Sequence, residues 1–211
     1  MPLSNRVTPF AELISDAARG LMMGNRGGRI HDRERELTAR RWASKQWICC
    51  KLEFNNRHRK VWGDSYTELF FLDEVTAFAA GHRPCFECRR KDAQEFARLF
   101  PRAHKAPEID RVLHGERLDG RSKRTHRQVI DALPDGATIA RGRDAFAVCG
   151  RHLLRWEPSG YVQAEPRPRG VDVDVLTPPS ILTVLVRGYA PLWHPSAQLR
   201  GGDAAPPASP G

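Results

Sequence analysis

The sequence of 211 residues predicts an α+β fold, with a small β-β-α module followed by a C-terminal antiparallel β region that a helix closes. Three patterns support this prediction. Strand-like segments between residues 46 and 71 lead into two helical segments. Short apolar runs then recur about every eight to ten residues from 134 to 165, and an apolar helix follows them.

We expect five segments along the chain. They are an N-terminal helix with a basic Gly-rich arm (1–45), the β-β-α module (46–102), a basic linker (103–127), a small β-rich region with a C-terminal helix (128–198) and a disordered tail (199–211).

The N-terminal segment predicts a short helix, because Thr8 and Pro9 fit an N-cap and a first helical position and Gly20 fits a helix end. The stretch from 24 to 41 is rich in glycine and arginine. It is either an arm that contacts phosphate or a plain loop, since it matches neither the dinucleotide-binding nor the Walker spacing.

The module begins with a strand in "WASKQWICCKLEF", whose alternation places Ile48 and Cys50 on one face and Trp47 and Cys49 on the other. Further strands are expected in "KVWGD" and "YTELFF".

Two helices complete the module. Asp73 is the expected N-cap of a helix over 74–80 that ends at Gly81. The apolar spacing of 89–100 predicts a second helix with one buried face.

The rest of the chain predicts a short helix over 125–133, a small antiparallel sheet, and a helix from Pro178 to Gly188. The final "GGDAAPPASPG" has too little apolar content to fold.

Composition limits the class of protein. No apolar run has the length of a membrane helix, and the N-terminus lacks the apolar stretch of a signal peptide, so we expect a soluble cytoplasmic protein without membrane partners. The net charge of +9 favours a polyanionic partner, although a solvated basic surface explains it as well. An odd count of five cysteines argues against a disulfide framework.

The most informative motif is Cys85-x-x-Cys88, directly after Pro84. Two thiolates at this spacing suit a zinc site, and tetrahedral zinc needs two further ligands. A thioredoxin-type redox pair is the alternative, but it occurs in a βαβ setting, whereas this segment reads β-β-α.

The stretch "YTELFFLDEVTAFAAGHRPCFECRRKD" resembles the metal-binding domain of the Ada DNA-repair proteins over roughly residues 46–93. The matching residues are Ala79, Ala80, Gly81 and Arg83, Pro84, Cys85, Cys88. The resemblance implies a zinc-stabilised module that binds DNA.

The same resemblance implies a second pair of ligands upstream. Counting back without gaps places them at His58, which can bind zinc, and at Phe54, which cannot. The Ada methyl-acceptor cysteine would stand at Phe54, so methyl-acceptor chemistry is not expected here. The fourth ligand is then expected from Cys50, or from Cys49 if the strand register differs by one residue.

Basic residues near this module are the expected nucleic-acid contacts, with DNA favoured over RNA. They are Arg40, Arg41, Arg57, Arg59, Lys60, Arg89, Arg90 and Lys91. Trp42, Trp47 and Trp62 lie near them and either stack on bases or form the module's core.

Zinc-dependent nucleic-acid binding is therefore the predicted function, and the sequence identifies no catalytic residue. A metal-dependent nuclease or hydrolase is the alternative, with Asp110, His114, Asp119 and His126 as a loose group of candidates. A protein-interaction adaptor is the third reading.

Overall fold

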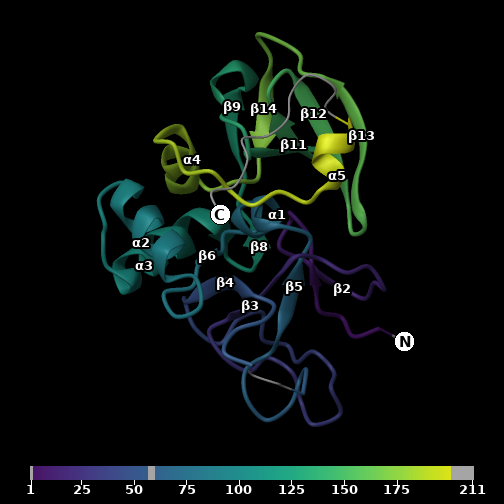
Figure 1. Ribbon diagram of the computed structural model, residues 1–211, viewed down its shortest axis with the longest axis vertical. Helices are drawn as coiled ribbons and strands as arrows, with labels where there is room; N and C mark the ends of the chain where they lie inside the picture. The colour runs from purple at the N-terminus through teal and green to yellow at the C-terminus, as the bar shows by residue number, and fades with distance from the viewer. Residues whose placement is uncertain (1, 57–59, 201–211) are drawn as a thin grey trace.

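Two six-stranded sheets form the framework of the protein (Figure 1). The structure is a computed structural model. It describes residues 2–56 and 60–200, and for residues 199 and 200 it describes the backbone alone. Sheet one has the strand order β2-β1-β5-β3-β4-β6, and sheet two is antiparallel throughout with the order β13-β12-β11-β10-β14-β9. The α+β prediction is confirmed.

The strands of sheet one come from residues on both sides of the boundary expected at 45/46. They are β1 (Arg6–Val7), β2 (Leu13–Ile14), β3 (Met22–Arg26), β4 (Trp47–Lys51), β5 (Leu69–Phe71) and β6 (Arg83–Pro84). Since β3 pairs with both β4 and β5, the N-terminal segment is part of this sheet and not an arm beside it.

The predicted helix between Thr8 and Gly20 is wrong, because this segment turns back after β1 and forms β2, which pairs antiparallel with β1. A Cβ on Gly20 would lie 1.8 Å from the Phe71 carbonyl oxygen, so this glycine permits close approach to β5 and does not end a helix. Pairing of β1 with β5 outweighs the local helix signal. The strand expected in "KVWGD" is also wrong, since Trp62 lies in a turn with φ of 56°.

Helix α1 (Glu74–Ala79) lies between the two sheets and is buried on every side (Figure 1). Asp73 caps it as predicted and accepts a hydrogen bond from the Thr76 N–H at 2.8 Å. Ala77 packs on sheet one, and Val75 packs against residues of sheet two. The helix ends at Gly81, whose φ of 84° suits a glycine.

Three more helices pack around Phe78 of α1, namely α2 (Arg90–Leu99), α3 (Ala106–Arg117) and α4 (Pro179–Val186). The predictions of α2 and α4 are confirmed. The basic linker instead contains α3 and the hairpin β7 (Leu118–Asp119) and β8 (Ser122–Lys123).

Sheet two consists of β9 (His126–Val129), β10 (Thr138–Arg141), β11 (Asp144–Cys149), β12 (His152–Glu157), β13 (Gly160–Pro166) and β14 (Asp172–Val175). The helix expected over 125–133 is wrong. Strand β9 and the 3₁₀ turn Ile130–Ala132 occupy it, because β9 pairs with β14.

The described chain ends in the short helix α5 (Ser196–Arg200), so the expected disordered tail lies almost wholly outside the described residues. None of the helices in the described part of the chain has the length and hydropathy of a transmembrane span.

Candidate metal centre and adjoining pocket

Three cysteines from two separate parts of the chain meet at one end of sheet one. The Sγ atoms of Cys50, Cys85 and Cys88 all lie within 4.8 Å of one another. Cys50 comes from β4, and the other two lie in the turn between β6 and α2. Three thiols at this spacing could hold a single metal ion.

Backbone pairing brings the two parts together. Strands β4 and β6 run parallel, and the Cys85 N–H continues their pairing with a 3.0 Å hydrogen bond to the Cys49 carbonyl oxygen. The chain then turns, so that the Glu87 N–H points at the Cys85 sulfur at 3.4 Å and the Arg89 N–H donates to the Cys85 carbonyl at 3.0 Å. These two contacts hold the turn that directly precedes α2.

The three thiols change one another's pKa through hydrogen bonds. Hydrogen bonds from the thiols of Cys50 and Cys88 hold the pKa of Cys85 far below its ordinary value, with backbone N–H groups adding to the effect. The same thiol contacts raise the pKa of Cys50, because its proton is shared with the neighbouring sulfurs. A metal ion would replace such shared protons, since thiolates are the ligating form.

The structure decides between the two adjacent cysteines of β4. Cys49 points to the opposite face, is fully buried, and receives a 3.3 Å hydrogen bond from Arg89. Burial raises its pKa to about 12. Of the two alternatives, Cys50 therefore joins the thiol group and Cys49 does not. His58 lies outside the described residues, and its ligation stays a prediction.

Cys149 and His82 lie in the core, away from the three thiols. Cys149 is buried in β11 of the other sheet. The His82 ring lies 5.0 Å from the Trp47 ring and 4.7 Å from the Phe71 ring, and burial lowers its pKa well below the ordinary value. His82 therefore packs in the core.

Arg89 is not a surface cation, which corrects its assignment as a nucleic-acid contact. Its guanidinium donates to both carboxylate oxygens of Glu74, at 2.6 and 2.9 Å, and to Asp92 at 2.8 Å. Only 7% of the side chain is exposed. The sequence could not show this, because Glu74 is fifteen residues away on another helix.

The other predicted contacts divide by exposure. Arg40, Lys60, Arg90 and Lys91 are exposed, and Arg41 is half-buried. Arg57 and Arg59 lie outside the described residues.

Several arginines contribute to the net charge without reaching the surface. Arg26 and Arg117 lie on the Trp47 ring, each 4.0 Å from its centroid. Their charges are met by backbone carbonyls, with Arg26 donating to Ala11 at 2.8 Å and Arg117 donating to Gly81 at 2.9 Å. Some of the arginine side chains behind the net charge are therefore buried inside the protein. Trp47 belongs to the core.

The residues considered for a nuclease do not form a metal-binding group within the described chain. Asp110 accepts two 2.8 Å hydrogen bonds from Arg83, and both side chains are buried. The His114 ring packs edge-on against Trp42, while Asp119 is exposed in β7.

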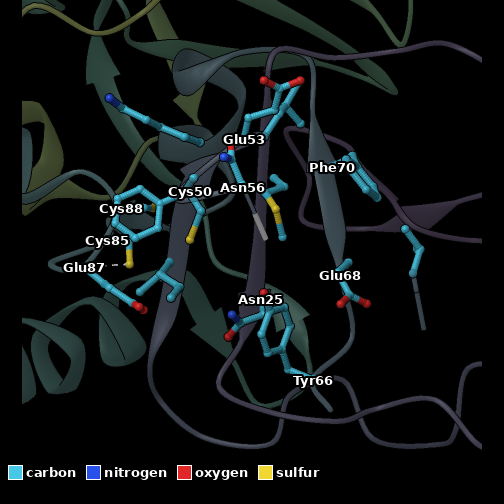
Figure 2. Close-up of a pocket in the computed structure, with 16 residues that line it drawn as sticks. Asn25, Cys50, Glu53, Asn56, Tyr66, Glu68, Phe70, Cys85, Glu87 and Cys88 are labelled. Carbon is cyan, nitrogen blue, oxygen red and sulfur yellow. Dashed lines mark hydrogen bonds between the residues drawn. The ribbon is translucent and has the colours of Figure 1, made fainter. Parts of the chain in front are cut away.

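A pocket of about 610 Å³ adjoins the three thiols on one face of sheet one. Figure 2 shows the cysteines on one side of it and Glu68 and Phe70 on the other, with Asn25 between them. Glu68 was missed from the sequence. The alternation in "TELFF" does place Glu68 and Phe70 on one face, but nothing local shows that this face borders the cysteines.

The fold and the site together define an α+β protein with a three-cysteine candidate metal centre beside a pocket. No family model matches the chain, and neither the curated proteins nor the solved structures contain a significant match to it. The resemblance to the Ada metal-binding domain therefore stays a prediction from the motif.

Proposed function

We propose that the protein binds Zn²⁺ through Cys50, Cys85 and Cys88 and that the zinc-loaded protein binds nucleic acid, with DNA favoured. The approach of the three sulfurs to within 4.8 Å carries the metal proposal. Thiolates favour Zn²⁺ over harder divalent ions such as Mg²⁺. His58 is the predicted fourth ligand.

In this proposal the metal is structural. It joins β4 to the turn before α2, two segments that the pairing of β4 with β6 and the Arg89–Cys49 hydrogen bond also connect. Binding energy at a site that exists only in the folded chain adds to folding stability.

Exposed cations near the site support nucleic-acid binding. Lys51 ends β4, Arg90 and Lys91 begin α2 directly after the cysteine turn, and Lys60 lies in the segment that borders the pocket. Such groups bind phosphates with little demand on geometry. The preference for DNA rests on the Ada resemblance alone.

Metal analysis of purified variants tests the ligand set. We expect Cys50→Ser, Cys85→Ser and Cys88→Ser to lose bound zinc. Two matched controls should keep it, namely Cys49→Ala on the other face of β4 and Cys149→Ala in sheet two. Full zinc occupancy in Cys85→Ser would refute the site, and full occupancy in His58→Ala would refute only that ligand.

Salt dependence tests the partner. A labelled DNA should bind at about 50 mM salt, with affinity falling linearly with salt on a double-logarithmic plot. Lys91→Ala should reduce the magnitude of this slope by roughly 1, which corresponds to the loss of one phosphate contact. Absence of binding at about 50 mM salt would refute the nucleic-acid proposal.

The pocket favours one alternative, a metal-dependent hydrolase. All three cysteines line it, so a metal held there would border a space large enough for a small substrate. Hydrolysis of a plasmid or model ester that disappears in Cys85→Ser would support this alternative over purely structural zinc.

A further inference from the structure

The pocket floor is formed by three adjacent strands of sheet one. In the strand register, Met23 of β3 lies opposite both Cys50 of β4 and Phe70 of β5. Asn25 lies opposite Ile48 one step along. All five line the pocket, because residues two apart on a strand share a face. The reverse face packs on α1, so this face is the only one of the two that a ligand can reach in the described structure.

Glu68 supplies a buried acceptor at the end of the floor opposite to the thiols (Figure 2). Its residue exposure is 2%. One carboxylate oxygen, Oε2, accepts from the Trp62 N–H at 2.8 Å, and the Glu68 carbonyl accepts from the Trp62 indole at 2.9 Å. The other oxygen, Oε1, has no hydrogen-bond partner among the described residues. A buried acceptor left unpaired costs about 1–3 kcal/mol, so a ligand N–H group would gain from meeting it.

The remaining walls suit a flat ring. Ile48, Leu52 and Val61 are apolar, and the half-buried rings of Phe70 and Tyr66 border the same space. The volume of about 610 Å³ falls within the usual range of small-ligand pockets.

Charged side chains of both signs border the pocket, since exposed Glu53 and Glu87 line it as well as cations. Lys51 is exposed and lines the pocket, and exposed Lys60 directly precedes the lining residue Val61. These two lysines could meet the phosphate of a ligand whose uncharged ring lies inside the pocket, since single-stranded nucleic acids bind through stacked bases and neutralised phosphates.

We propose that this pocket binds one unpaired base of a single-stranded nucleic acid, with the ring against Phe70 and Tyr66 and a base N–H donated to Glu68 Oε1. This inference rests on the proposed nucleic-acid binding. It adds how the nucleic acid is recognised, namely through an unstacked base that contacts the rings and forms a hydrogen bond through its edge. Duplex DNA keeps its bases stacked and paired, so it could contact only the surrounding cations.

The first test changes the protein and uses the zinc-loaded full chain with labelled ten-nucleotide homopolymers and a ten-base-pair duplex. Glu68→Gln can keep the Trp62 contact through its amide oxygen while it presents an N–H₂ donor in place of the free acceptor. We expect at least one homopolymer to bind about tenfold more tightly than the duplex at equal salt, and Glu68→Gln to weaken that binding about tenfold. Glu95→Gln makes the same charge change on the exposed face of α2 and should alter affinity less than about twofold.

The second test changes the nucleic acid and uses only the wild-type protein. A single abasic position is moved along the tightest-binding homopolymer, which removes one base and keeps every phosphate. Loss of affinity of about tenfold at one or two positions supports the pocket.

The outcomes separate the two proposals. The base pocket would be overturned, with nucleic-acid binding left in place, by three results together. Single strands and duplex would bind equally, abasic sites would have the same effect at every position, and Glu68→Gln would behave like Glu95→Gln. Absence of binding to any strand at about 50 mM salt would overturn both. If Glu68→Gln fails to fold, Phe70→Leu and the abasic series decide the question.

Discussion

Replacing Arg89 by alanine should destabilise the fold strongly, although this arginine lies in a basic run that looks like a surface patch in the sequence. Its guanidinium holds both oxygens of Glu74, whose side chain is 1% exposed. Glu74 also accepts from the Tyr189 hydroxyl and the Leu192 N–H, each at 3.0 Å. This carboxylate therefore ties α1 to α2 and to the segment after α4.

The magnitude follows from what the substitution leaves behind. Without Arg89, Glu74 keeps two neutral donors but loses its counter-charge in a buried site. Removing one member of a buried ion pair costs about 3–5 kcal/mol. In a chain of this size, that loss corresponds to a fall in the unfolding midpoint of about 6–20 °C.

The assay is thermal and urea unfolding of the zinc-loaded protein. Lys91→Ala, an exposed site two residues along the same helix, is the matched control and should change stability by less than about 0.5 kcal/mol. Adding Glu74→Gln to Arg89→Ala should recover part of the loss, because it removes the uncompensated charge. An Arg89→Ala protein as stable as the control would show that the ion pair does not hold these helices together.

Three further predictions concern other parts of the fold. Gly81→Ala should destabilise by about 2 kcal/mol or more in urea titration, because its φ is 84° and the new Cβ would lie 2.7 Å from Arg117 side-chain atoms; unchanged stability would contradict this geometry. Burial and nearby guanidinium groups lower the pKa of Lys123 to about 7 from its ordinary 10.5, and its amino group donates to the Ala79 carbonyl at 2.5 Å. Between these two values unfolding takes up a proton, so wild-type stability should rise from pH 7 to pH 10 relative to Lys123→Met, and parallel pH profiles of the two proteins would refute it. A chelator should lower the unfolding midpoint of the wild type but leave Cys85→Ser unaffected, and an equal response of both proteins would exclude the three cysteines as the metal site.

Local signals explain which elements were predictable. Asp73 and Gly81 bound α1 through contacts within a few residues, and the turns of sheet two follow the same short-range chemistry. The helix expected after Thr8 failed for the opposite reason, since Arg6 just before it pairs with Phe70 of β5 and Gly20 at its end lies against the Phe71 carbonyl, both more than fifty residues away in sequence. Long-range pairing of this kind leaves no local trace that competes with a capping signal.

The candidate site shows the same division. The sequence by itself determined the Cys85-x-x-Cys88 turn and the alternation of β4, because both depend on neighbouring residues. Only the tertiary structure decided that Cys50 and not Cys49 joins the turn, that Arg89 is an internal cation, and that Glu68 borders the pocket. These three facts depend on which strand lies beside which, and strand order is set by burial across the whole sheet rather than by any single segment.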